Sequence, residues 1–169
     1  ILHFPKNLEI LGKDWCSLTK NLNKIEISPN NPNFTYLDPD QKIILGKTDK
    51  KGQIFDVIVF ACRDTEKVTI PSYIKHIESN SFSQCQKMSN FEIERNSKLE
   101  TIGDSSFTCT IFKTVKFPST LRKIGKEIFS QSRIEICEFD ENCLIEKFPN
   151  SLFISSSITT LTIPKEVSE

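Results

Sequence analysis

The sequence predicts a repeat solenoid of the α/β class, in which short parallel strands alternate with brief helical turns. Three observations lead to this prediction. Corresponding apolar positions recur every 22 to 25 residues, the units open on an alternating apolar segment, and the 169-residue chain contains 13 phenylalanines but only 5 glycines. Because a hydrophobic fraction of 37% is too high for a disordered chain, we interpret residues 1–169 as a single solenoid fragment.

The clearest unit begins with the segment Val68-Thr69-Ile70-Pro71. Its alternation directs two apolar side chains inward and predicts a short strand, which Pro71 ends because proline has no N–H to donate. The rest of the unit, through Phe82, must return the chain to the next strand, and we expect a single turn of 3₁₀ or α-helix there, on the convex side. Residues 67–169 form the C-terminal repeats, with further strand segments expected at 91–93, 115–117, 137–139 and 161–163.

The same frame extends upstream into N-terminal repeats, residues 1–27. Leu2-His3-Phe4-Pro5 and Ile25-Glu26-Ile27 lie 23 residues apart, but the next step, from Ile25 to Val68, is 43 residues. The intervening segment contains two strand-like stretches, 42–46 and 54–60, separated by a polar turn. We therefore interpret residues 28–66 as a β-hairpin region inserted into the array.

Stacked units give a right-handed solenoid with a concave parallel β-sheet, and its inward Ile, Leu and Phe residues form continuous ladders. Stacking also aligns the outward residue of each strand into a polar stripe of mixed charge. We take this concave stripe as the candidate protein-binding site, and the alternative is that it is only a solvated sheet face. Its members are Glu26, Thr69, Glu92, Lys116, Glu138 and Thr162.

Composition and charge exclude several classes of partner. The chain has 22 basic and 22 acidic side chains and a net charge of zero, so it lacks the basic surface typical of nucleic-acid binding. No apolar run approaches the roughly 20 residues that span a bilayer. The first residue is Ile1 and no signal-peptide pattern follows it, so we expect an internal or processed fragment.

The sequence gives little support for catalysis, a metal or a cofactor. Six cysteines occur without a C-x-x-C pair, and neither His3 nor His76 lies at ligand spacing from a cysteine. No nucleophile motif is present, and the scarcity of glycine argues against phosphate-binding loops. Cys85 and Cys109 both fall at a convex-side position, where buried free thiols are expected and a disulfide between adjacent repeats is left open. Asn33-Phe34-Thr35 is the one N-x-S/T glycosylation sequon.

The repeated string Ile-x-Ile-Pro-x-x-Val/Leu-x-x-Ile-Gly-x-x-x-Phe-x-x-Cys resembles the BspA-type leucine-rich repeats of surface proteins in bacteria and parasitic protists. Departures from the pattern include Cys16, where a unit usually has Phe, and Glu78, where it has Gly. Residues 31–60 are similar to an insertion that recurs in the same family.

The resemblance implies a non-enzymatic adhesion module, at the cell surface or secreted, that binds host or cell-surface proteins through the concave face or the hairpin. The alternative is an intracellular leucine-rich-repeat scaffold that mediates protein–protein interaction. The hairpin or the solenoid ends are further candidates for self-association.

Overall fold

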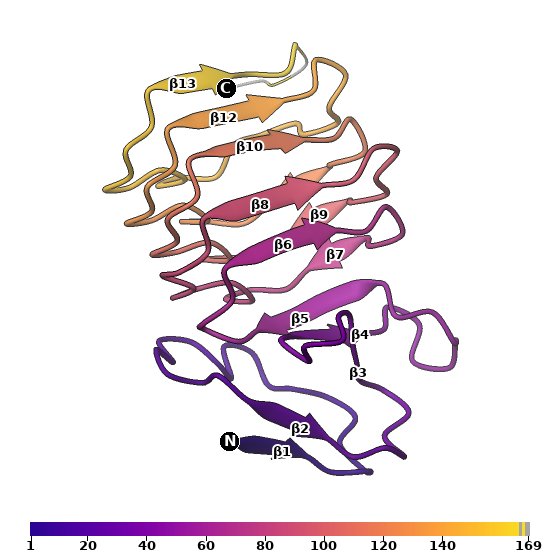
Figure 1. Cartoon of the computed structure of the whole chain (residues 1–169). Helices are drawn as coiled ribbons and strands as arrows, with labels where there is room; N and C mark the ends of the chain where they lie inside the picture. The colour runs from indigo at the N-terminus through magenta and orange to yellow at the C-terminus, as the bar shows by residue number, and fades with distance from the viewer. Residues whose placement is uncertain (166, 168–169) are drawn as a thin grey trace.

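The computed structural model, which describes residues 1–165 and 167, is a solenoid of stacked coils with the two termini at opposite ends (Figure 1). One strand per coil forms a parallel row along one face. This row consists of β1 (Leu2–Phe4), β2 (Ile25–Ile27), β6 (Lys67–Ile70), β8 (Asn90–Ile93), β10 (Thr114–Phe117), β12 (Ile136–Phe139) and β13 (Thr160–Thr162). The strand segments expected from the sequence thus form this row.

The row is divided into three separate parallel sheets, β1–β2, β6–β8 and β10–β12–β13. Within each sheet the register follows the repeat, so that Val68 pairs with Phe91 and Val115 pairs with Cys137. Strands β6 and β10 alternate exposed and buried residues, because the inward side chains enter the core and their neighbours face solvent.

A second ladder of strands, which the sequence did not predict, runs along another side of the solenoid. It consists of the parallel two-residue strands β7 (His76–Ile77), β9 (Thr101–Ile102) and β11 (Lys123–Ile124), and β7 also pairs with β5 (Val57–Ala61). Strand β5 pairs antiparallel with β4 (Ile43–Gly46), and β4 pairs antiparallel with β3 (Thr35–Tyr36). Strand β5 thus belongs both to the solenoid ladder and to the antiparallel sheet. The boundaries of the inserted region, residues 28 and 66, stay a prediction.

Glycine is required where the second ladder ends, because successive coils approach closely there. A Cβ added to Gly103 would lie 2.4 Å from the backbone nitrogen of Ser79, and one added to Gly125 would lie 2.4 Å from that of Asp104. Each glycine thus packs on the backbone of the preceding coil. Glu78 stands at the equivalent position after β7. The neighbour of β7 on that side is β5 of the antiparallel sheet, and the Glu78 side chain is exposed.

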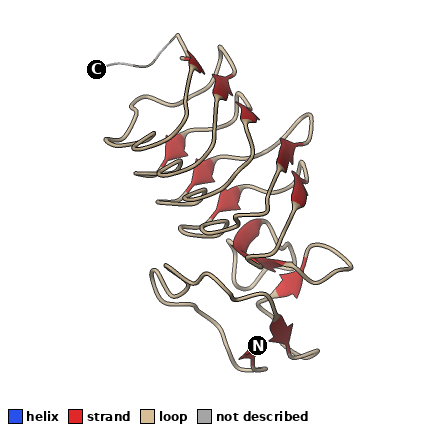
Figure 2. Cartoon of the chain, turned by 60° about the vertical axis from the view of Figure 1, so that its left-hand side comes forward, coloured by secondary structure: helices blue, strands red, loops and turns tan. Residues whose placement is uncertain are grey.

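The expected helical turns on the convex side are absent from the described residues, which contain strands and loops but no helix (Figure 2). In the turn around Phe82, Ser81 and Ser83 N–H donate to carbonyls three residues earlier, but Phe82 and Gln84 N–H donate to carbonyls of the next coil at 2.9 and 2.8 Å. Asn80 and Gln84 have positive φ values of 60° and 65°, and residues in this left-handed conformation prevent a continuous right-handed helical turn. Prediction of the α/β class and of 3₁₀ or α turns was therefore wrong, and the fold is a β-solenoid.

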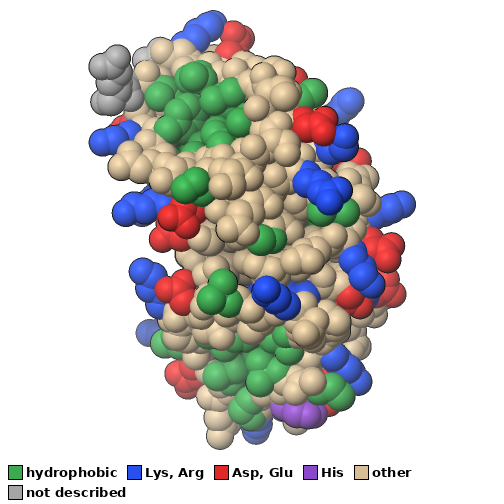
Figure 3. Space-filling model, turned by 90° about the vertical axis from the view of Figure 1, so that its left-hand side faces the viewer, with side chains coloured by type: hydrophobic (Ala, Val, Ile, Leu, Met, Phe, Trp, Pro, Cys, Tyr) green, Lys and Arg blue, Asp and Glu red, His purple; other side chains and the backbone are tan. Residues whose placement is uncertain are grey.

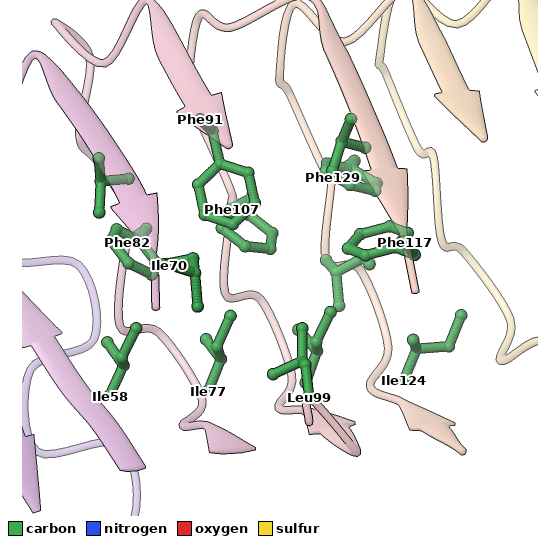
Figure 4. Packing of buried hydrophobic residues seen from close by; sticks show 14 of the residues in the cluster. Ile58, Ile70, Ile77, Phe82, Phe91, Leu99, Phe107, Phe117, Ile124 and Phe129 are labelled. Atoms are coloured by element: carbon green, nitrogen blue, oxygen red, sulfur yellow. The ribbon is translucent and has the colours of Figure 1, made fainter. Parts of the chain in front are cut away.

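The core consists of apolar ladders that run along the solenoid axis (Figure 4). Phe82, Phe107, Phe129 and Phe153 stack in succession with ring centroids 5.4 to 5.6 Å apart and interplanar angles of 5 to 16°. A second cluster around Phe4, Phe34, Ile44 and Phe60 lies under the N-terminal coils and the antiparallel sheet. The excess of phenylalanine in the sequence is thus accounted for by side chains stacked at equivalent positions.

Candidate functional site

The outward residues of the strand row form the stripe predicted from the sequence. We call these six residues the strand stripe: Glu26, Thr69, Glu92, Lys116, Glu138 and Thr162. Register places Thr69 opposite Glu92 and places Glu138 between Lys116 and Thr162. All six side chains are exposed or half-buried, whereas the inward neighbours in β6 and β10 are buried.

At the N-terminal end of the strand stripe, Glu26 is held by two neighbours. Lys24 Nζ lies 2.7 Å from one of its carboxylate oxygens, and His3 Nδ1 lies 3.0 Å from the other. The hydrogen bond from Lys24 holds the pKa of the Glu26 carboxyl below its usual value, and it raises the pKa of the Lys24 ammonium. This end of the stripe is already paired within the chain.

The middle of the strand stripe is a hollow of about 440 Å³ at the break between β8 and β10. Glu92, Lys116 and Glu138 line it together with apolar strand residues. Phe91 occupies an inward position there and stacks on Phe112 with ring centroids 5.2 Å apart. Two carboxylates therefore flank one ammonium group above an apolar floor, and this arrangement suits a protein surface that carries basic and apolar side chains.

The remaining members of the strand stripe lie apart from this hollow. Thr69 lines a different cavity of about 720 Å³, which is bounded by β6 and by the loop from Leu37 to Lys42. Glu26 and Thr162 line neither of these two cavities. The sequence missed the cavity beside Thr69, because it is created by the break in the strand row and not by the repeat pattern.

The six cysteines are free thiols, and five of them are buried. Cys85 lies at the buried position that Ser132 occupies two coils later. Cys109 lies one position earlier in its turn and is half-exposed between Gln84 and Gln131, with its Sγ 3.4 and 3.5 Å from their side-chain amide atoms. Both thiols are free, but the prediction that both are buried holds for Cys85 and is wrong for Cys109.

Other chemically notable residues have structural partners. His76 Nδ1 lies 2.8 Å from Thr101 Oγ1 on the neighbouring strand. Asn33 of the sequon is buried, and its side-chain amide donates to the Leu8 carbonyl at 3.2 Å. Within residues 1–165 and 167, no group of three or more His, Cys, Asp or Glu side chains has a metal-binding arrangement, and no helix could cross a bilayer.

The C-terminal end of the solenoid exposes apolar side chains, which gather near that end of the face shown in Figure 3. Ile154, Leu161 and Ile163 are between 38 and 54% exposed. Strand β13 pairs with β12 on one edge and has no strand on its other edge among the described residues. Self-association through the solenoid ends stays a prediction.

Comparison with known proteins supports the repeat assignment. A family model described as "BspA type Leucine rich repeat region" matches residues 54–169 in six copies. Among solved structures, a leucine-rich repeat protein from Eubacterium ventriosum is similar with a TM-score of 0.69 and 18% identity, over 96% of this chain and 48% of that one. The pneumococcal vaccine antigen PcpA is similar with a TM-score of 0.50 and 23% identity, over 69% of this chain and 29% of that one. A search of curated proteins found no significant match.

Proposed function

The chain belongs to the BspA-type leucine-rich repeat family, and from this premise we propose that it is a protein-binding module and not an enzyme. The observation that carries the proposal is the hollow in the strand stripe, where Glu92, Lys116 and Glu138 meet on one exposed face. Strands β10 and β12 are paired in register, which preorganises Lys116 and Glu138 for a partner, and Glu92 faces them from β8 across the break.

The ligand that this hollow suits is a protein surface with basic residues around an apolar contact. In keeping with the family resemblance, we propose a host extracellular or cell-surface protein as the partner, and a cell-surface or secreted location for the chain. The chain spans about half the length of the similar Eubacterium protein, so the proposal concerns the module and not a whole protein.

A second candidate, an intracellular scaffold for protein–protein interaction, is supported by the thiols. All six cysteines are free, which is typical of proteins kept in a reducing compartment. Antibody labelling of intact cells distinguishes the two candidates. Labelling without permeabilisation supports the surface module, and labelling only after permeabilisation supports the scaffold.

The binding role is tested by affinity capture with a charge-reversed variant. We expect Glu92→Lys together with Glu138→Lys to abolish capture of any protein that the wild type retains, because the hollow would then contain three ammonium groups. The matched control is Glu9→Lys together with Glu127→Lys, which reverses two exposed charges outside the strand stripe. Equal capture by all three proteins would contradict a binding role for the stripe.

A further inference from the structure

The strand row is interrupted between β2 and β6, where the chain makes its antiparallel sheet. Among the described strands, β2 pairs with β1 alone and β6 pairs with β8 alone. The break leaves two strand edges in the middle of the solenoid, and their backbone donors and acceptors need other partners.

The edge of β2 at this break is closed by a side chain. Tyr36, on β3, donates its hydroxyl hydrogen to the Ile25 carbonyl at 2.8 Å and accepts the Ile27 N–H at 2.8 Å. One phenol thus satisfies both backbone groups that a neighbouring strand would otherwise bind.

The edge of β6 at the same break is open. The Ile70 carbonyl accepts the Glu94 N–H at 3.0 Å on the β8 side. Because alternate residues of a strand direct their backbone groups to opposite edges, Lys67 and Thr69 direct theirs away from β8. In the described part of the chain, neither residue's backbone N–H or C=O has a hydrogen-bond partner on that side.

Space for a ligand lies directly against this edge. The cavity of about 720 Å³ has β6 as one wall and the loop from Leu37 to Lys42 as the other, with Val68 and Ile43 at its apolar floor. An extended peptide binds as an added strand where two features meet. One is a sheet edge with free backbone groups, and the other is an adjacent groove that accepts alternate side chains.

The charges around the groove specify the kind of peptide. Asp38, Asp40 and Glu66 line it, whereas the ammonium of Lys42 is already paired with Asp64 at 2.9 Å. The other lysine in the lining, Lys67, has no ion pair with any residue that the structure describes, and the groove carries an excess of negative charge. We propose that the β6 edge binds an extended segment of a partner protein, rich in Lys or Arg and alternating with apolar residues, by strand addition. This site is separate from the hollow in the strand stripe and does not depend on it.

A labelled pentapeptide, Thr-Lys-Val-Lys-Val, tests the proposal by fluorescence anisotropy. We expect it to bind the wild-type chain, and we expect the same peptide with N-methylated valines to bind at least about tenfold more weakly, because it lacks amide donors needed for strand pairing. Thr69→Pro removes an edge N–H without touching the β6–β8 ladder, and it should weaken binding to a similar extent. Thermal unfolding by circular dichroism checks that this variant folds.

Charge reversal separates the groove from other acidic surfaces. Asp40→Lys should weaken binding of the pentapeptide, whereas Glu9→Lys and the Glu92→Lys, Glu138→Lys double variant should leave it unchanged. Equal binding of the N-methylated peptide, or undiminished binding to a folded Thr69→Pro variant, would overturn the proposal. A third result would also overturn it: the pentapeptide does not bind, and the wild-type chain forms a dimer that Thr69→Pro dissociates. In that case a second copy of the chain would occupy the β6 edge.

Discussion

The guanidinium of Arg63 donates from Nη1 to the backbone carbonyl of Ser81 at 2.9 Å, and Ala61 N–H donates to the same carbonyl at 2.9 Å. Arg63 is 3% exposed, has no ion pair within the described residues, and lies over the Phe60 ring at 4.3 Å. Elsewhere the convex turns bind one another through backbone bonds, such as Phe82 N–H to the Ser106 carbonyl. Where the antiparallel sheet interrupts that series, the Arg63 side chain supplies donors in addition to the backbone N–H of Ala61.

Replacement of Arg63 should therefore destabilise the junction between the N-terminal coil and the later repeats. The guanidinium also donates to the carbonyls of Cys16, Thr19 and Asn80. In Arg63→Met all of these carbonyls lose the guanidinium as a donor, although the Cys16 and Asn80 carbonyls keep the N–H groups of Thr19 and Ser83. Because the Thr19 carbonyl loses its donor and the guanidinium's contact with Phe60 is also lost, we expect the free energy of unfolding to fall by roughly 3 kcal/mol. Urea denaturation measures the loss.

Arg63→Lys should recover only part of this stability, because an ammonium group lacks the planar fork of five donors. The control is Arg133→Met, at an exposed arginine. If Arg63→Met unfolds at the same urea concentration as the control, the guanidinium does not stabilise the junction.

The phenylalanine ladder predicts that the cost of truncation depends on position. Phe107 packs between Phe82 and Phe129 and also contacts Phe91 and Phe112 by ring edges, so Phe107→Ala should cost about 3–5 kcal/mol.

Phe153 is the matched control, because it is partly exposed and stacks on Phe129 alone among the described rings. Phe153→Ala should cost clearly less than Phe107→Ala in the same denaturation experiment. Equal costs would show that stacking along the ladder does not set the stability of a coil.

The strands of the main row were predictable because their apolar residues alternate and recur with a fixed period. The second ladder was not, since its strands, such as Thr101–Ile102, are too short for alternation to be seen. The convex turns were predicted as helical because the sequence shows only that the chain must return. Their left-handed residues, among them Gln84 and Cys109, are not glycines and carry no composition signal.

The candidate site was predicted only in part for a similar reason. The members of the strand stripe follow from the repeat register, but the grouping of Glu92, Lys116 and Glu138 depends on where the sheet divides. That division is a property of three-dimensional spacing. A lone arginine directly after the apolar segment 57–62 was the one available signal for the junction at Arg63.

Thiol accessibility gives a direct test of the convex turns. Cys109 is the only cysteine that is not buried, so a thiol reagent such as DTNB at pH 8 should modify one thiol in the native protein and six in urea. Cys109→Ser should remove the native reaction completely. Rapid modification of a second thiol in the native protein would show that another cysteine position is open to solvent.

The sequon at Asn33 should carry no glycan in the folded protein. Its side-chain amide donates to the Leu8 carbonyl and the residue is 8% exposed, so a sugar on that nitrogen has no room. Expression in a glycosylating host and mass spectrometry of the folded secreted protein check this.

The control is the double variant Lys51→Asn, Gln53→Thr, which creates a sequon in an exposed turn. It should be glycosylated under the same conditions. A glycan on Asn33 in protein with the native melting temperature would contradict the placement of this residue.

Stability should also fall at alkaline pH, because the buried thiols keep their protons longer in the folded chain than in the unfolded chain. Burial raises the pKa of the Cys85 thiol from 9.0 to about 11, and it also raises the pKa of Cys16, Cys62, Cys137 and Cys143. Because the pKa of the thiol is higher in the folded state, its contribution to the free energy of unfolding is complete below pH 9 and is lost as the pH rises towards 11. Urea denaturation between pH 8 and pH 11 should show a smaller loss for Cys85→Ala than for wild type. A slope for Cys85→Ala equal to that of wild type would contradict the assignment of this loss to the Cys85 thiol.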